Sequence, residues 1–343
     1  MVTSPAPCMS SKSVSPSHTQ AHSHDPDQGD ATTPTPATVT VLGAGAWGSV
    51  LGRLSQANQH HVKIWSRRNG MDLAESAKEV DLLISAISMK GVPDIAQQLQ
   101  TIGLAPHTII VTATKGLDPE TLQMPSQIWQ AAFPHHPVVV LSGPNLAKEI
   151  EQGLPAATVV ASNDTKASAV VQQVFASEIF RVYTNTDPLG TELGGTLKNV
   201  IAIAVGVCDG LNLGTNAKSA LITRALPEIL SIGNCLGAQA ETFWGLSGLG
   251  DMLATCSSSL SRNYRVGYGL AQGKPLNQVL EELNSTAEGV NTAHVLIDLA
   301  NQHGIPVPIS RQVHRLLNGM ITPEEAVDAL MARALKPEAC FLK

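Results

Sequence analysis

The sequence has few aromatic residues and no excess of basic ones. Phe, Trp and Tyr together make up 3% of the 343 residues, and the formal net charge is -6. Proteins whose main partner is a nucleic acid usually present a basic surface, often with aromatic side chains on which bases stack. We therefore do not expect nucleic acid to be the main partner of this chain.

Cysteine is also scarce, and the cysteines are scattered along the chain. Their number is odd and no two form a Cys-x-x-Cys pair, so neither a disulfide framework nor a zinc site is expected. The pattern is typical of a reduced, cytoplasmic protein, and we predict no bound metal. The five residues are Cys8, Cys208, Cys235, Cys256 and Cys340.

Long apolar runs are missing as well. The apolar run Val200 to Val207 is followed at once by Cys-Asp-Gly, and no uninterrupted stretch reaches the length needed to span a bilayer. Because 43% of the residues are nevertheless hydrophobic, the chain can bury a large core and is expected to divide into two domains.

Residues 1–36 have almost no large apolar side chains. Such a segment buries too little to offset the entropy of ordering, so we predict a disordered tail. It lacks the apolar centre of a secretory signal, and unlike a transit peptide it is acidic and has no arginine. Its acidic residues are Asp25, Asp27 and Asp30. Three histidines could bind a metal ion, although solvated side chains are the simpler interpretation: His18, His22 and His24.

After the tail, the pattern becomes that of a dinucleotide-binding unit. A β-branched strand over 37–42 leads directly into the glycine-rich segment GAGAWG at 43–48. A helical pattern then runs to about Asn58, and a second strand follows over 61–66. A strand, this glycine spacing, a helix and a strand within about thirty residues predict a Rossmann unit. A glycine turn in an unrelated α/β protein is the alternative.

Each glycine of this segment has a distinct expected use. Gly43 allows the tight turn, Gly45 lets the backbone approach a pyrophosphate, and Gly48 lets the helix press against the strand. The free N–H groups at the start of the helix would hold the phosphate.

The end of the second strand indicates which dinucleotide binds. NAD enzymes usually have Asp or Glu here, which binds the ribose 2′-hydroxyl. This chain has Ser66, Arg67 and Arg68 instead, and two guanidinium groups could bind a 2′-phosphate. We predict NADP(H), with NAD(H) still possible; a solvated arginine pair on a turn is the alternative.

Four further segments are nearly continuous in apolar residues, which is typical of strands covered on both faces of a sheet. They span residues 80–88, 107–116, 137–145 and 156–163. We therefore predict an α/β fold in which residues 37–186 form a Rossmann-like domain around a parallel sheet.

Ligands of such sheets bind at the carboxyl ends of the strands. Lys115 stands at one of these ends and is expected to touch the ligand. Lys90 stands at another, but a role in capping the following turn explains it as well. The strand ends are Gly43-Ala44-Gly45, Arg67-Arg68, Ser88-Met89-Lys90, Thr114-Lys115-Gly116 and Ser142-Gly143-Pro144-Asn145.

Beyond Thr186 the segments have helical spacing or composition, so residues 187–343 are expected to form an all-helical domain. Its first helix starts at Asp187-Pro188 and meets no breaker before Asp209-Gly210. It contains the segment ELGGTLKNV, in which one lysine, Lys198, lies on a face of small and apolar residues. The neighbours on this face are Thr191, Gly194, Gly195, Ala202 and Val205.

Lys198 is the candidate general acid/base. Each glycine in a helix costs about 0.5–1 kcal/mol relative to alanine, so two glycines beside one lysine require an explanation, such as the close approach of a ligand or another backbone. Desolvation would lower the pKa of the lysine towards neutral pH, where it could exchange a proton with a substrate oxygen. A lysine that only covers apolar surface is the alternative.

Two later segments are suited to binding an anion. The glycine-rich GLSGLGD ends in Asp251, which could also simply cap the helix that follows. In SSSLSRNYRVG, Ser261 is a predicted N-cap with Arg262 and Asn263 in the first turn. An arginine at a helix start opposes the helix dipole, and a phosphate bound there would resolve that conflict.

Seven segments of the chain stand in a distinctive order: GAGAWG, SMKG, TATKGL, SGPNLAKEI, ELGGTLKNV, GLSGLGD and SRNYRVG. In order and spacing they resemble the bacterial type of NAD(P)-dependent glycerol-3-phosphate dehydrogenase, from about Ala37 to the end of the chain. The resemblance implies reversible reduction of dihydroxyacetone phosphate to sn-glycerol 3-phosphate for phospholipid synthesis. It also implies a Rossmann domain followed by a helical domain, and a homodimer.

The resemblance also implies roles for individual residues. Lys198 would be the general acid/base, and Lys115 would touch both cofactor and substrate. The substrate would further contact Gly143, Asn145, Asp251, Ser261, Arg262 and Asn263. The dinucleotide would contact the glycines of GAGAWG together with Ala46, Trp47, Arg67, Arg68, Ala147, Arg262, Thr286 and Glu288.

The chain departs from the family pattern in several places. Asn145-Leu146 stands where Ser-Phe or Thr-Phe is usual, Thr286 replaces a residue that is usually aliphatic, and the segment 69–79 is short. Two other functions remain open. One is a β-hydroxyacid dehydrogenase acting on a small carboxylate, which also has a lysine on a helix after a Rossmann domain. The other is a non-catalytic NADP(H)-sensing module.

Overall fold

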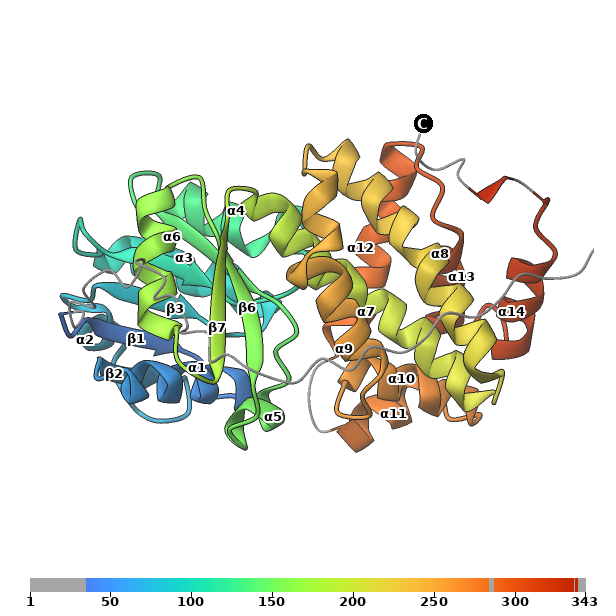
Figure 1. Cartoon of the computed structure of the whole chain (residues 1–343), viewed down its shortest axis with the longest axis horizontal. Coiled ribbons are helices and arrows are strands. Elements are labelled where there is room, and N and C mark those ends of the chain that lie inside the picture. Colours follow the sequence, from blue (N-terminus) through green and yellow to red (C-terminus); the bar gives the residue numbers. More distant parts are fainter. Residues whose placement is uncertain (1–34, 284–286, 336, 339–343) are drawn as a thin grey trace, which may run out of the picture. The chain divides into compact units, whose positions relative to one another are not determined.

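Within the described residues, seven strands form one sheet in the order β2-β1-β3-β4-β5-β6-β7. The computed structural model (Figure 1) describes residues 35–283, 287–335 and 337–338. The predicted tail therefore falls almost wholly outside the described residues, as does Thr286. The strands are β1 (Thr38–Leu42), β2 (His61–Trp65), β3 (Leu82–Ser85), β4 (Ile109–Thr112), β5 (Val138–Ser142), β6 (Ala156–Ala161) and β7 (Phe180–Asn185).

The α/β fold class is confirmed, with two differences from the prediction. First, β6 pairs with β5 in antiparallel orientation, so the sheet is mostly rather than entirely parallel. The apolar pattern of a strand does not encode its direction. Second, β7 was not predicted. Its residues alternate between buried and exposed because it lies at the sheet edge, so it lacks the continuous apolar run of the inner strands.

The order of the first three strands creates a switch point, the place at which ligands of such sheets bind. β1 lies between β2 and β3 and is parallel to both. The chain therefore leaves β1 towards one side of the sheet, through β2, and then continues on the other side, through β3. The carboxyl ends of β1 and β3 flank this switch point.

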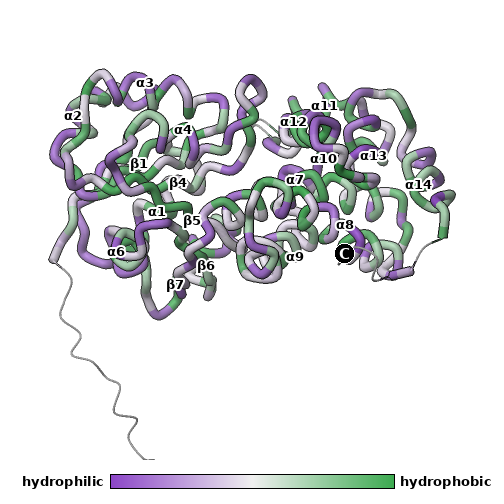
Figure 2. Tube along the Cα trace, turned by 90° about the horizontal axis from the view of Figure 1, so that it is seen from above, coloured by the Kyte–Doolittle hydropathy of each residue, from purple (hydrophilic) through white to green (hydrophobic). Residues whose placement is uncertain are grey.

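Helices cover both faces of the sheet. One apolar core joins the strands to α1 and α6, and a second joins them to α2, α3 and α4; Figure 2 shows these two groups on opposite sides of the strands. The covering elements are α1 (Ala46–Ala57), α2 (Leu73–Ala77), the 3-10 turn η1 (Met89–Gly91), α3 (Val92–Ile102), α4 (Pro125–Ala132), α5 (Ala147–Glu151) and α6 (Thr165–Phe175).

After β7 the described chain is helical. The elements are α7 (Pro188–Gly210), α8 (Gly214–Cys235), η2 (Ala240–Trp244), the π-helical turn η3 (Leu246–Gly250), α9 (Asp251–Cys256), α10 (Arg262–Ala271), α11 (Leu276–Leu283), α12 (Glu288–Gln302), α13 (Pro308–Leu317) and α14 (Pro323–Met331). The bounds of α7 match the predicted start at Asp187-Pro188 and the predicted end at Asp209-Gly210.

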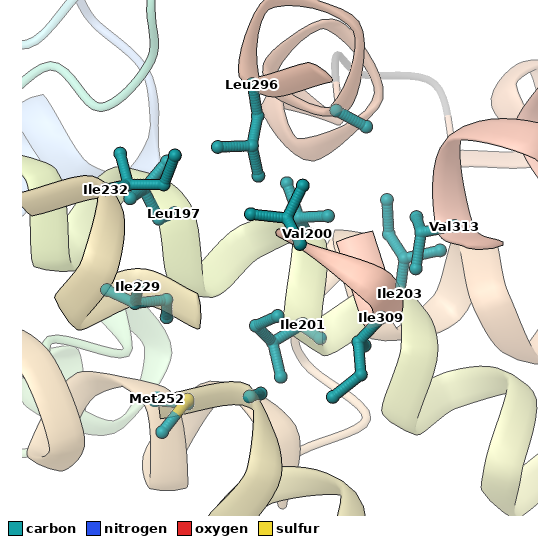
Figure 3. Close-up of a cluster of buried hydrophobic side chains, with 14 of the residues drawn as sticks. Leu197, Val200, Ile201, Ile203, Ile229, Ile232, Met252, Leu296, Ile309 and Val313 are labelled. Carbon is teal, nitrogen blue, oxygen red and sulfur yellow. The ribbon is translucent and has the colours of Figure 1, made fainter. Parts of the chain in front are cut away.

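Helix α7 is the centre of the helical region. Figure 3 shows Val200, Ile201 and Ile203 of α7 among side chains of α8, α9, α12 and α13. In the described residues, α7 is the one helix whose length and composition would allow it to cross a membrane. However, 89% of its most apolar 18-residue stretch is buried inside the protein. Its hydropathy is therefore explained by its place in the core.

Candidate functional site

The turn after β1 contains three glycines. At two of them the surrounding backbone leaves no room for a side chain, whereas the third has space beside it. Gly43 has φ +115°, and a Cβ there would lie 2.6 Å from the carbonyl oxygen of Ala86, after β3. A Cβ on Gly48 would lie 2.0 Å from the carbonyl oxygen of Gly43. By contrast, a Cβ on Gly45 would have no described atom within 4 Å. Gly45 therefore borders open space, as expected of a residue that a ligand approaches.

The start of α1 is suited to a phosphate. Gly45 is its N-cap, no side chain of this helix caps its first N–H groups, and its first turn has no acidic residue. Ala46 is exposed, while Trp47 packs against the core of the sheet. The free N–H groups and the positive end of the helix dipole are thus available to an anion.

Arg67 and Arg68 lie beside this turn. Both are exposed and follow β2, whose Trp65 is in register with Leu42 of β1. Asn69 fixes the turn, because its Nδ2 donates to the carbonyl oxygen of Ile64 over 2.8 Å and its Oδ1 accepts from the Ser66 N–H over 3.2 Å.

Three charged side chains from separate parts of the chain meet at the carboxyl edge of the sheet. The Nζ of Lys198, on α7, lies 2.7 Å from Oδ1 of Asp251 at the start of α9. The Nζ of Lys115, after β4, lies 2.5 Å from the other carboxylate oxygen and 3.4 Å from the carbonyl oxygen of Gly143. Lys198 also donates to the hydroxyl of Thr255, one turn along α9 from Asp251. One carboxylate thus bridges two amines.

This cluster is nearly dry. The side chains of Lys198 and Asp251 are 8% and 3% exposed, whereas that of Lys115 is 22% exposed. Burial lowers the pKa of Lys198 to about 8, and the Lys115 charge lowers it too, although Asp251 opposes both effects. Burial by itself would raise the pKa of Asp251, but the two lysines outweigh it and hold that pKa below its usual value. Asp251 is therefore an ionised partner of both lysines, not simply a helix cap.

The two glycines before Lys198 admit neighbouring segments to α7. A Cβ on Gly194 would lie 2.8 Å from the carbonyl oxygen of Ser247, in η3. A Cβ on Gly195 would lie 2.3 Å from the hydroxyl oxygen of Ser142, at the end of β5, and 3.4 Å from Cε of Lys115. The glycines therefore bring both the sheet edge and the turn that leads to Asp251 close to Lys198.

The start of α10 has the predicted cap. The Oγ of Ser261 accepts from the N–H of Tyr264 over 3.2 Å, and Arg262 is exposed. Asn263 is buried, and its Oδ1 accepts from the N–H of Gly289 over 3.0 Å. A Cβ on Gly289 would lie 2.8 Å from the carbonyl oxygen of Asn199, so this bond brings the start of α10 next to the residue after Lys198.

Glu288, the first residue of α12, reaches the same region from another direction. Its Oε2 lies 3.5 Å from the Cβ position of Gly116, the residue after Lys115. The predicted contacts Lys115, Asn263 and Glu288 are thus grouped around the same part of α7.

The residues after β5 lie against β6. A Cβ on Gly143 would lie 3.0 Å from Cα of Thr158. Asn145 donates to the carbonyl oxygen of Ala157 over 3.1 Å and accepts from the Thr158 hydroxyl over 2.9 Å. Ala147 begins the short helix α5. The Asn145 amide is thus engaged within the protein, and its contact with substrate stays a prediction. Lys90 is exposed in η1 and has no described hydrogen bond in that turn.

Sequence reasoning missed three polar residues of the site. Thr255 could have been found from its position four residues after Asp251, on the same side of one helix. Ser142 was noted only as a strand end; its hydroxyl is buried and has no partner among the described residues. Thr196 accepts a hydrogen bond from the N–H of Gly116 over 3.1 Å, and nothing in the sequence pattern indicates that contact.

An apolar cavity of about 660 Å³ lies elsewhere, among α7, α8, α13 and α14. Glu228 lies in its wall and accepts hydrogen bonds from the first residues of α13, while burial raises its pKa to about 7. The predicted site residues do not line this cavity, so its size alone does not make it the site of the chemistry.

The bridging carboxylate generates a stability prediction. Asp251→Asn leaves two ammonium groups facing each other, one of them buried, without a negative partner. Removing one member of a buried ion pair costs about 3–5 kcal/mol, so we expect a loss of that size in the free energy of unfolding, measured with denaturant near pH 7. Glu282→Gln is the control, because its ion pair with Lys274 is exposed and should change stability little. Equal losses in the two variants would contradict the prediction.

Comparison with known proteins places this geometry in a family. Residues 187–328 match the family model described as the NAD-dependent glycerol-3-phosphate dehydrogenase C-terminus. Residues 38–71 and 68–168 match the corresponding N-terminus model.

Full-length relatives agree with these matches. The glycerol-3-phosphate dehydrogenase, NAD(P)+ type, of Acaryochloris marina is 67% identical over 301 residues, which cover 88% of this chain and 97% of that protein. The equally named protein of Trichormus variabilis is 64% identical over 297 residues, covering 87% and 97%. The crystal structure of glycerol-3-phosphate dehydrogenase from Coxiella burnetii has a TM-score of 0.84 at 31% identity, covering 88% of this chain and all of that one. The chain therefore belongs to the NAD(P)-dependent glycerol-3-phosphate dehydrogenase family.

Proposed function

We propose that this chain catalyses the reversible reduction of dihydroxyacetone phosphate to sn-glycerol 3-phosphate, that it prefers NADPH, and that Lys198 is the general acid/base. The observation that carries the proposal is the buried cluster of Lys198, Asp251 and Lys115 at the carboxyl edge of the sheet. The names of the two relatives, glycerol-3-phosphate dehydrogenases of the NAD(P)+ type, support the choice of substrate and cofactor class.

Lys198 is suited to proton exchange in both directions. In reduction, its ammonium group donates a proton to the carbonyl oxygen as negative charge develops there. In oxidation, its neutral amine accepts the proton of the alcohol. A pKa of about 8 keeps both forms accessible near neutral pH, which is the condition for efficient general acid/base catalysis.

The other two members of the cluster have distinct tasks. Asp251 and the Thr255 hydroxyl accept hydrogen bonds from the Lys198 amine. These bonds orient the amine before the reaction, so its orientation adds little to the activation barrier. Lys115 is partly exposed at the sheet edge and is proposed to touch both the cofactor and the substrate.

The substrate phosphate is proposed to bind at the start of α10. Arg262 is exposed there, the helix N-terminus favours an anion, and Ser261 and Asn263 complete the predicted contacts. Gly143 and Asn145 are proposed to lie near the rest of the substrate. Holding a phosphate away from the reacting carbon orients the ketone, so part of the binding energy contributes to turnover.

The glycine turn after β1 is proposed to hold the dinucleotide. The open space at Gly45 and the uncapped start of α1 fit a pyrophosphate, and Arg67 and Arg68 fit a 2′-phosphate. NADPH, when bound, supplies the hydride. The proposed contacts, of which Thr286 lies outside the described residues, are Gly43, Gly45, Ala46, Trp47, Gly48, Arg67, Arg68, Lys115, Ala147, Arg262, Thr286 and Glu288.

Four broader features also remain proposals. The product would supply glycerophospholipid synthesis, the enzyme would be cytoplasmic, and it would form a homodimer, which light scattering can test. The boundary between the Rossmann and helical domains would lie between residues 186 and 187. The last strand ends before it, at Asn185, and α7 begins after it, at Pro188.

The first prediction from this proposal concerns Lys198. Lys198→Ala removes the proton donor, so we expect kcat for NADPH oxidation with dihydroxyacetone phosphate to fall by about 10²–10⁴-fold, with cofactor affinity nearly intact. Lys274→Ala, at an exposed ion pair, serves as control. Near-normal turnover in Lys198→Ala would refute the assignment. Succinic and tartronic semialdehydes, assayed in parallel, test the β-hydroxyacid alternative.

The second prediction concerns pH. Above the pKa of about 8 that Lys198 has without bound ligand, the ammonium form declines, so kcat/KM for reduction should fall by about tenfold per pH unit there. Oxidation needs the neutral amine, so its kcat/KM should rise up to the same pH and then level off. The measurement is kcat/KM in each direction, which reports the titration of the free enzyme, and profiles that bend the same way would exclude Lys198 as the titrating group.

The third prediction concerns cofactor choice. Arg67→Asp replaces a cation with a carboxylate that repels a 2′-phosphate and accepts a hydrogen bond from a 2′-hydroxyl. Because a hydrogen bond to a charged group contributes about 1.5–3 kcal/mol, the kcat/KM ratio of NADPH to NADH should fall at least about tenfold. Arg181→Asp, on the opposite sheet edge, is the control. An unchanged ratio in Arg67→Asp would show that a residue other than Arg67 contacts the 2′-phosphate.

A further inference from the structure

Helix α7 holds both ends of one segment of the sheet region. The Thr196 hydroxyl oxygen accepts from the N–H of Gly116 over 3.1 Å. One turn earlier, the Glu192 carboxylate accepts from the N–H of Ser126 over 3.0 Å and from its hydroxyl. Thr196 and Glu192 are 0% and 2% exposed, and their spacing of four residues puts them on one side of the helix. The segment 116–126 is therefore attached to α7 at its first residue and its last.

Between these attachments the segment is packed into the same core as α7. Leu117 and Met124 are 3% and 2% exposed and belong to the apolar cluster that contains Leu193 and Leu197. The segment is thus held to α7 by apolar packing as well as by hydrogen bonds.

Lys115 immediately precedes the first attachment. Its stem passes over Gly195 of α7, with Cε 3.4 Å from the Cβ position of that glycine, and its Nζ ends on Asp251 and the carbonyl oxygen of Gly143. The bond from Gly116 to Thr196 joins the peptide next to Lys115 to the helix that carries Lys198. A shift of that peptide would carry the Lys115 amine with it.

We propose that Thr196 is a positioning residue for Lys115: by accepting the N–H of Gly116 it sets the Lys115 amine against Asp251 beside Lys198, while Glu192 holds the far end of the same segment. The inference rests on the role proposed for Lys115 in binding cofactor and substrate. Thr196 and Glu192 are buried polar side chains that take no part in the proposed proton exchange, and the inference gives each of them a structural role.

The test compares two threonines of one helix. Thr196→Val keeps the shape of the side chain but leaves the Gly116 N–H without its acceptor, whereas Thr196→Ser keeps the hydroxyl. Thr191→Val is the matched control, because Thr191 is also 0% exposed on α7 but its hydroxyl has no partner among the described residues. We expect kcat/KM to fall by about 10–10²-fold in Thr196→Val, as for small misplacements of reacting groups, and to stay near the original value in Thr196→Ser and Thr191→Val.

A second step separates positioning from a general loss of structure. In a Lys115→Met background, Thr196→Val should lower kcat/KM no further, because the group that it displaces is absent. A further fall as large as in the original protein would overturn the inference. If Thr196→Val does not fold, Thr196→Ala replaces it in both steps.

The outcomes also separate this inference from the proposal on which it rests. If Lys115→Met keeps near-normal kcat/KM, the role of Lys115 is wrong. If Lys115→Met loses activity while Thr196→Val does not, the role of Lys115 stands and the role of Thr196 is wrong.

Discussion

One carboxylate holds the candidate site together. Asp251 accepts from Lys198 through one oxygen and from Lys115 through the other, and so connects α7, α9 and the end of β4. Without it, two ammonium groups would face each other in a space from which water is largely excluded, and their repulsion would oppose the close approach of the sheet edge to α7. Asp251 is therefore one of the contacts that set the distance between this edge of the sheet and Lys198, together with the hydrogen bond from Gly116 to Thr196.

Helix α7 can serve this arrangement because its two halves differ. Its second half is apolar and fixed in the helical core by residues such as Ile201 and Val205. Its first half has Gly194 and Gly195, where the absence of a Cβ admits η3 and the end of β5. The cost of two glycines within a helix, roughly 0.5–1 kcal/mol each, is offset by the burial that the rest of the helix provides. The helix thus presents the Lys198 amine at a close contact between two parts of the fold.

The sequence was sufficient for the fold class and for the local structure around several candidate site residues, because hydropathy patterns and glycine spacing are local properties. Gly43, Gly48 and the N-cap Ser261 could be assigned from their neighbours alone. The direction of β6, the edge strand β7 and the bridging of Lys115 to Lys198 could not, since each depends on how distant segments pack. Asp251 illustrates the limit: its sequence context allows a simple helix cap, and only the fold brings two lysines to it.

The charge of the cluster bears on the kind of substrate that it can accept. With both lysines protonated, the three groups alone carry a net charge of +1, since two ammonium groups face one carboxylate. A buried net charge is unfavourable, and the lowered pKa of Lys198 is one sign of that cost. An anion that enters the site relieves it, whereas a neutral molecule of the same size does not. Under the proposed function, a phosphorylated ketone would therefore suit the site in two ways: its phosphate would meet the helix start and the exposed arginine of α10, and its charge would favour the protonated form of Lys198.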